Sequence, residues 1–112
     1  MEFSESLKKN EDFRNVYRNG VSRANRQLIL YQIANGTERN RLGISVSKKV
    51  GNSVVRHRMA RLIRESYRLN ESDFSRGYDI VVVVRSSAVK LDYFGMEKSL
   101  IHLAKLHNIY RK

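Results

Sequence analysis

Residues 42–69 read LGISVSKKVGNSVVRHRMARLIRESYRL and contain two patterns with different periods. In the first part, Leu42, Ile44 and Val46 alternate with small residues, which is typical of a strand with one apolar face. From Asn52 to about Leu69 the apolar residues recur at helical spacing instead. A helical wheel places these residues on the side that packs on a sheet: Val55, Met59, Leu62, Ser66 and Leu69. The stretch therefore predicts a strand followed by an amphipathic helix.

The residues before this stretch predict one helix and one more strand. Asn10, Glu11 and Asp12 can cap a short helix, and Gly20 suits the position just past its end. Residues 27–34 are mostly apolar and predict a strand that is buried largely on both faces. The polar residues 35–40 predict a hairpin loop that joins this strand to the next one.

The residues after the stretch complete the fold. Residues 78–85 include four consecutive valines and predict a central strand, and Asp92 can cap a last helix. The predicted order over residues 1–112 is α-β-β-α-β-α. This order predicts a single α+β domain, an α/β sandwich of the ribosomal-protein-like type, with helices packed on a mainly antiparallel sheet.

The charge of the chain is large and uneven. The 112 residues carry 22 lysines and arginines against 11 acidic residues, a net charge of +11. Residues 48–68 alone hold seven basic residues and one acidic residue. Such an excess repels itself unless a polyanion takes it up. Nucleic acid is the first candidate partner, and an anionic membrane surface is the second.

Composition also excludes several classes of protein. The chain has no cysteine, which excludes disulfides, thiolate metal sites and cysteine nucleophiles. No apolar run approaches the ~18 residues of a membrane span, and the first five residues lack the apolar stretch of a secretory signal. We therefore expect a soluble intracellular protein.

The predicted helix at 52–69 carries cations on the side opposite its apolar one. Four residues, spaced i, i+4, i+7 and i+11, form what we call the basic stripe: His57, Arg61, Arg64 and Arg68. Two more arginines flank the stripe, and two lysines precede the helix near its first turn: Arg56, Arg58, Lys48 and Lys49. Planar guanidinium groups about one helical turn apart suit successive backbone phosphates, and the N–H groups at a helix start also bind anions.

No set of residues in the sequence predicts hydrolysis by the protein itself. The three histidines, His57, His102 and His107, are scattered, and the last two miss the i, i+4 spacing of a helical metal pair. A two-metal nuclease needs a cluster of acids, and the carboxylates here are single residues among basic neighbours. We expect neither catalytic residues nor a metal site on the protein.

Residues 48–65, KKVGNSVVRHRMARLIRE, resemble the signature of the protein subunit of bacterial ribonuclease P, whose centre is Arg-Asn-Arg. The resemblance extends to residues 7–13, Val16-Tyr17, Gly20, residues 24–27 and Leu30-Tyr31. Two positions depart from the family pattern. His57 stands where asparagine is usual, and Ala60 stands where lysine is common, which makes Arg61 and Arg64 the surer RNA contacts.

The resemblance implies a partner in a ribozyme. In this family a large RNA carries the active site and uses Mg²⁺, bound mainly by that RNA, to remove the 5′ leader from precursor tRNA. The protein then needs no small-molecule cofactor and no membrane, and a cytoplasmic location is expected. The residues implied in binding the catalytic RNA are Lys48, Lys49, Asn52, Arg56, His57, Arg58, Arg61, Arg64 and Arg68.

The family also binds the single-stranded 5′ leader, in a cleft between the first helix and the sheet. Three aromatic residues match that cleft, and three polar residues are candidates for its rim: Phe13, Tyr17 and Tyr31, with Arg23, Asn25 and Arg26. Aromatic platforms beside cations are what unpaired RNA requires, although a Phe and a Tyr at i, i+4 are also common core residues.

Two other readings fit the composition. One is a ribosomal protein or general RNA chaperone without a catalytic association. The other is a DNA-binding protein that lays the helix at 52–69 in a major groove. The stretch that resembles the ribonuclease P family argues against the first, and competition between precursor tRNA and duplex DNA at matched salt would decide the second.

Overall fold

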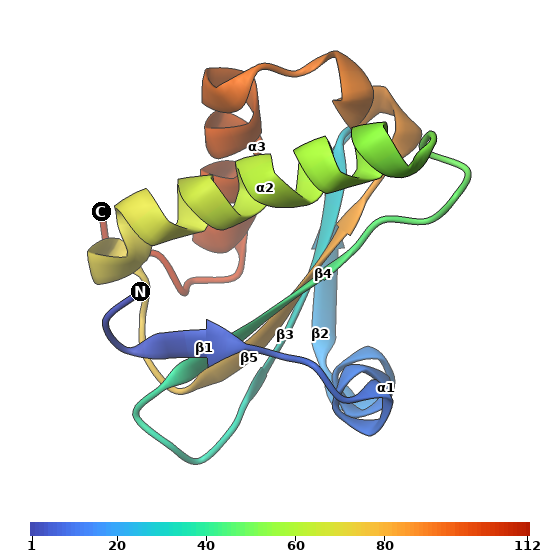
Figure 1. The fold of residues 1–112 in the computed structure, drawn as a ribbon. Coiled ribbons are helices and arrows are strands. Elements are labelled where there is room, and N and C mark those ends of the chain that lie inside the picture. The colour runs from blue at the N-terminus through green and yellow to red at the C-terminus, as the bar shows by residue number, and fades with distance from the viewer.

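The computed structural model describes all of residues 1–112, which form a five-stranded sheet covered by three α-helices (Figure 1). The elements are β1 (Ser4–Ser6), α1 (Asn10–Asn19), β2 (Val21–Ala24), β3 (Leu28–Ala34), β4 (Asn40–Ser45), α2 (Ser53–Asn70), β5 (Tyr78–Val84) and α3 (Tyr93–Leu106). Short 3-10 turns follow α2 and β5, at Glu71–Asp73 and Ser86–Lys90. The predicted α+β architecture and its six main elements are confirmed, and β1 and β2 add two strands.

The sheet is mixed, with the strand order β1-β4-β5-β3-β2. β5 pairs antiparallel with β3 and parallel with β4, while β1 is parallel to β4 and β2 antiparallel to β3. The predicted hairpin between β3 and β4 is therefore wrong, because β5 lies between them. The antiparallel pairings join more residues than the parallel ones, and the two parallel pairings, both with β4, make the sheet mixed. The valines of β5, apolar on both faces, suit the centre of a sheet covered on both sides.

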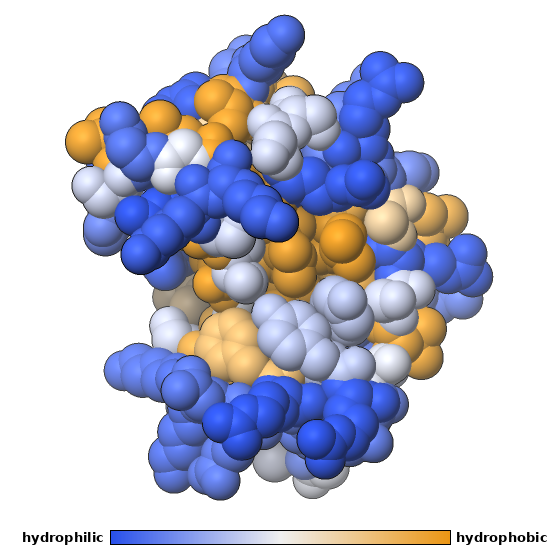
Figure 2. Space-filling model, turned by 90° about the vertical axis from the view of Figure 1, so that its right-hand side faces the viewer, coloured by the Kyte–Doolittle hydropathy of each residue, from blue (hydrophilic) through white to orange (hydrophobic).

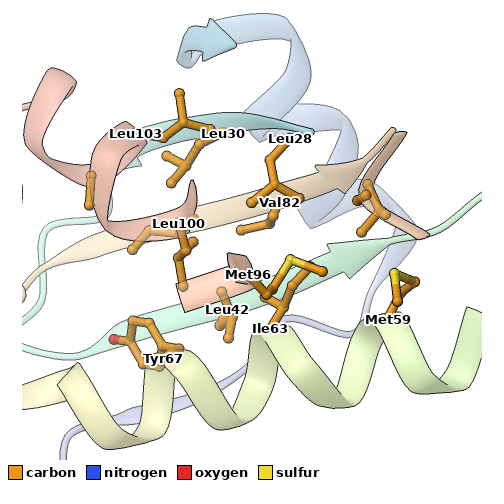
Figure 3. Packing of buried hydrophobic residues seen from close by; sticks show 14 of the residues in the cluster. Leu28, Leu30, Leu42, Met59, Ile63, Tyr67, Val82, Met96, Leu100 and Leu103 are labelled. Carbon is orange, nitrogen blue, oxygen red and sulfur yellow. The ribbon is translucent and has the colours of Figure 1, made fainter. Parts of the chain in front are cut away.

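α2 and α3 cover one face of the sheet and enclose the main core (Figure 3). Leu30 and Val82 contribute from the strands, Met59 and Ile63 from α2, and Leu100 from α3. These side chains are almost completely buried, and burial of this kind stabilises each side chain by about 1.5–3 kcal/mol. The main core fixes the position of α2, and with it the outward face of that helix.

The buried side of α2 differs in part from the predicted one. Met59 and Ser66 are buried as expected, but Ile63 and Tyr67 complete the buried side, and Leu69 is 56% exposed. The hydroxyl of Tyr67 is satisfied by Ser4 Oγ at 2.7 Å and by the Nδ2 atom of Asn40 at 3.0 Å. A buried tyrosine is tolerated because its hydroxyl has partners.

α1 packs on the opposite face of the sheet with a smaller core. Val16 of α1 is fully buried against Leu7 and Val81. The ring of Phe13 lies over Gly43 of β4, where a Cβ atom would come within 2.7 Å of Phe13 Cζ. Tyr31 of β3 is only half-buried on this face. α1 therefore leaves part of the sheet face accessible.

Candidate nucleic-acid interface

The start of α2 is organised by a turn and a cap. Residues 48–50 form a turn in which the N–H of Val50 donates to the carbonyl oxygen of Ser47 at 3.1 Å. Asn52 is the N-cap, and its Oδ1 accepts from the N–H of Val55 at 3.0 Å. Lys48 and Lys49 are exposed in this turn. The predicted lysines therefore lie at the N-terminal end of α2, where the helix dipole adds positive potential.

The basic stripe faces solvent along α2. His57, Arg61, Arg64 and Arg68 are all exposed. Arg68 forms an ion pair with Glu65, and the hydrogen bond from Arg68 holds the pKa of that carboxyl below its usual value. The only other ion pairs in the chain are those of Arg41. Arg61 and Arg64 are therefore free cations, while the charge of Arg68 is largely neutralised within the helix.

The two arginines that flank the stripe are placed differently. Arg58 donates from Nη1 to the carbonyl oxygen of Val89 at 3.2 Å and from Nη2 to that of Leu91 at 3.0 Å. It thus holds the segment before α3 against α2, a structural role that the helical spacing did not indicate. Arg56 is half-buried, and its Nε atom is buried without a partner.

Arg56 and His57 border a hollow of about 240 Å³ between α2 and the end of β4. The apolar side chains of Ile44 and Val46 line its strand side, and Ala60 lines its helix side. The position where the family commonly has lysine is thus part of this hollow. It joins the guanidinium of Arg56 and the imidazole of His57 to apolar surface of the sheet.

The aromatic residues of α1 and β3 gather in a row. The ring centroids of Phe13 and Tyr17 lie 6.3 Å apart, and those of Tyr17 and Tyr31 lie 4.9 Å apart, edge to face. Tyr17 is 39% exposed, and the other two are half-buried. We call these three residues the aromatic row. The structure therefore brings together the three residues predicted for the leader cleft.

Figure 2 shows the face of the molecule that contains α1 and the start of α2. Apolar surface lies in a hollowed band between two hydrophilic rims, with α1 along the lower rim and α2 along the upper one. Exposed cations lie on both helices: Lys9, Arg14 and Arg18 around α1, and Arg61 and Arg64 on α2. An apolar band between cationic rims matches the chemistry of unpaired RNA, which presents flat bases and a charged backbone.

The three polar residues predicted for the rim of this cleft lie elsewhere. Arg23 pairs with Leu30 across β2 and β3, so its side chain lies on the α3 side of the sheet, opposite Tyr31. Asn25 donates to Ser99 of α3, at 2.9 Å to Oγ and 3.1 Å to the carbonyl oxygen. Arg26 follows it in the β2–β3 turn. Arg23 and Asn25 therefore lie on the face of the sheet opposite the aromatic row. A contact of these three residues with the leader stays a prediction.

Sequence reasoning missed the group that fixes α1 to the sheet. Arg41 of β4 donates to Asp79 at 2.8 and 2.6 Å and to Asp12 of α1 at 3.2 Å. Hydrogen bonding to Asp79 raises the pKa of Arg41. Asp12 directly precedes Phe13, so this triad positions the aromatic row. Asp79 is a lone carboxylate in the apolar strand β5, and in the sequence it was the one sign that a buried ion pair lies here.

No three side chains of His, Asp or Glu gather as they would around a metal ion. None of the helices combines the length and apolar character that crossing a membrane requires.

The fold and these surfaces define a class: a small basic α+β protein that presents a cationic helix and an apolar aromatic band to a polyanion. The sequence profile of the family Ribonuclease P matches residues 1–107. The chain belongs to the bacterial ribonuclease P protein family, which assigns it to tRNA processing within a ribonucleoprotein endoribonuclease.

Individual relatives agree with this family over nearly the whole chain. The ribonuclease P protein component of Lachnoclostridium phytofermentans is 58% identical over 106 residues, covering 95% of this chain and 91% of that protein. The Staphylococcus aureus RNase P protein has a TM-score of 0.87 at 39% identity, covering 94% of this chain and 96% of that one. The Thermotoga maritima protein has a TM-score of 0.84 at 30% identity, with coverages of 90% and 96%.

Proposed function

We propose that the chain binds the catalytic RNA of ribonuclease P through the start and outer face of α2, and the 5′ leader of precursor tRNA through the aromatic row. In this arrangement the RNA subunit holds the active site and most of the Mg²⁺ that the reaction needs. The protein contributes position and electrostatics, with no catalytic residue of its own, in the cytoplasm. The observation that carries the proposal is the unpaired charge of Arg61 and Arg64 beside an accessible aromatic row.

The charge of α2 supports the RNA contact. Of the predicted contacts, Lys48, Lys49, Arg61 and Arg64 are exposed cations with no carboxylate partner, so a phosphate would be their first strong partner. The guanidinium of Arg58 is already bound to two backbone carbonyl oxygens, and we assign it the role of holding the surface in shape. We expect phosphate contacts mainly from the four free cations.

The aromatic row supports the leader contact. Tyr17 and Tyr31 present an edge-to-face pair at the accessible part of the sheet, and the adjoining surface is apolar. Bases of a single strand stack on such groups without a requirement for a particular sequence. The exposed cations beside the aromatic row are Arg14 and Arg18 of α1, and we propose that they contact leader phosphates in place of the residues of the β2–β3 turn.

Binding at both surfaces would place the scissile phosphate relative to the RNA active site. Cations on α2 reduce repulsion between the catalytic RNA and the substrate backbone, and a tethered leader limits the freedom of the cleavage site. Mg²⁺ held by the RNA subunit would supply an activated water for cleavage of the phosphodiester. The products are a mature tRNA with a 5′-phosphate and a leader with a 3′-hydroxyl.

The test is reconstitution at low Mg²⁺. Purified protein is added to the catalytic RNA and a precursor tRNA, and cleavage at the mature 5′ end is measured. We expect the protein to restore cleavage, and the variant R61Q/R64Q to restore much less. The variant K105Q/K112Q removes the same charge from exposed positions in α3 and at the C-terminus, outside the predicted contacts, and is the matched control. Equal stimulation of cleavage by the two variants contradicts the contact between α2 and the catalytic RNA. No stimulation by the native protein contradicts the proposed function and favours a general RNA chaperone.

A further inference from the structure

A second cationic hollow lies on the opposite side of the sheet from the aromatic row. It has a volume of about 420 Å³ and lies between the β2–β3 turn and α3. Its charged side chains are Arg26 from the turn and Lys98 from α3, and His102 adds an imidazole. None of its lining residues is a carboxylate. The hollow, which we call the α3 groove, therefore presents only cationic and neutral groups.

Hydrogen bonds build the groove from two distant segments. Asn25 Oδ1 accepts from the N–H of Gln27 at 3.1 Å and from that of Leu28 at 2.8 Å, which fixes the turn. Asn25 Nδ2 reaches Ser99 Oγ at 2.9 Å and lies 3.3 Å from His102 Nδ1. When Asn25 donates to Nδ1, the neutral imidazole carries its proton on Nε2. His102 can then act as a donor toward a bound anion.

An exposed aromatic ring borders the groove. Phe94 is 73% exposed, it directly precedes the groove residue Gly95, and it lies one helical turn from Lys98. Its ring meets that of Tyr93 edge to face, with centroids 5.4 Å apart, while most of the Phe94 surface is open to solvent. An aromatic face beside a cationic groove provides a stacking platform next to a phosphate site.

We infer that the α3 groove binds single-stranded RNA, with a phosphate held by Arg26, Lys98 and His102 and a base stacked on Phe94. The site is separate from the aromatic row, because Arg26 lies on the α3 side of the sheet and α1 covers the other side. It is separate from the α2 surface, because no residue of α2 lines the groove. Two RNAs could supply this segment: an unpaired region of the catalytic RNA, or the part of a long leader that extends beyond the aromatic row.

The test compares a groove variant with a variant of equal charge. R26Q/K98Q removes two exposed cations from the groove, and K105Q/K112Q removes two from outside it. Binding to the catalytic RNA, and separately to precursor tRNA in the assembled complex, is measured as a function of salt. We expect the groove variant to flatten the salt slope by about 0.7, as the loss of one single-strand phosphate contact predicts. Identical slopes for the two variants, with both RNAs, overturn the inference.

A second variant tests the stacking contact without a change of charge. Phe94 is exposed and outside the core, so F94L should fold normally. We expect F94L to weaken the affected complex by about fivefold or more, and native affinity would contradict the stacking assignment. A defect with the catalytic RNA alone identifies that RNA as the source. A defect only with long-leader precursors identifies the leader. R61Q/R64Q, measured in parallel, tests the α2 contact, so the groove can fail while that contact holds.

Discussion

The pairing state of each arginine in the basic stripe predicts how binding to the catalytic RNA depends on salt. Arg61 and Arg64 have no carboxylate partner, whereas Arg68 is bound to Glu65. Replacing Arg61 and Arg64 with alanine should remove two phosphate contacts. Each contact contributes about 0.9 to the slope of log K against log salt, so the slope should fall by about 1.8. Between about 50 mM and about 200 mM salt, the double variant should therefore lose about twelvefold less affinity than the native protein.

A substitution that should strengthen binding to the catalytic RNA provides the internal check. Replacing Glu65 with glutamine releases Arg68 from its ion pair and keeps the size of the side chain. Binding to the catalytic RNA should become tighter, and its slope should steepen by up to about 0.9. The assay is filter binding or fluorescence anisotropy with catalytic RNA over a salt series. An unchanged slope in R61A/R64A, or no response to E65Q, would refute the view that this face of α2 meets RNA phosphates.

Three further predictions concern the aromatic row and the core. Tyr17→Ala should slow single-turnover cleavage of precursors with long leaders by about fivefold or more and leave short-leader precursors nearly unaffected, because stacking requires leader bases. An equal loss of cleavage with both kinds of precursor would make Tyr17 a core residue. Gly43→Ala should displace the ring of Phe13, since the new Cβ would lie 2.7 Å from Phe13 Cζ, and we expect denaturant unfolding to report a loss of about 1–3 kcal/mol together with weaker leader binding. Burial lowers the pKa of His107 below 6.5, although a hydrogen bond to Leu30 opposes the shift. The unfolded chain then binds the proton more readily than the folded one. The contribution of His107 to the free energy of unfolding is therefore complete above pH 6.5 and is lost as the pH falls through 6.5 toward the lower folded pKa. His107→Gln should flatten that dependence in denaturant titrations between about pH 8 and about pH 5.

Local patterns were sufficient for the main elements. The period of residues 52–69 predicted α2 within one residue, and the predicted cap Asp92 accepts the N–H of Gly95. The side-chain cap predicted from Asn10, Glu11 and Asp12 is wrong, because α1 already includes these residues and its N-cap, Lys9, makes no side-chain cap hydrogen bond. The four valines predicted a central strand, which β5 is. In each case the signal lies within a few residues of the element, so no knowledge of distant partners was required.

The missed features depend on residues that are far apart in the chain. β1 has three residues, and all four residues of β2 are exposed, so neither has an apolar period. The insertion of β5 between β3 and β4 leaves no mark in the loop at 35–39. Burial of Tyr67 instead of Leu69 requires Ser4 and Asn40 as partners. Such features follow from tertiary packing, which outweighs local preference.

In the candidate site, too, local spacing predicted some features and distant contacts determine the others. Cationic residues on the outside of α2 and aromatic residues on α1 follow from helical spacing, and the structure places them as predicted. The ion pair of Arg68, the carbonyl contacts of Arg58 and the turn of Arg23 toward α3 do not follow from spacing. A count of charges cannot tell which cations are already satisfied within the fold.

The central place of β5 has a consequence for how the protein is made. Residues 78–84 pair with both β3 and β4, which have no hydrogen-bonded contact with each other. A nascent chain that has emerged only through α2 therefore has two strands without their shared neighbour, and its basic helix has no complete sheet to rest on. We expect the RNA-facing surfaces to acquire their relative positions in one late step, after β5 has left the ribosome.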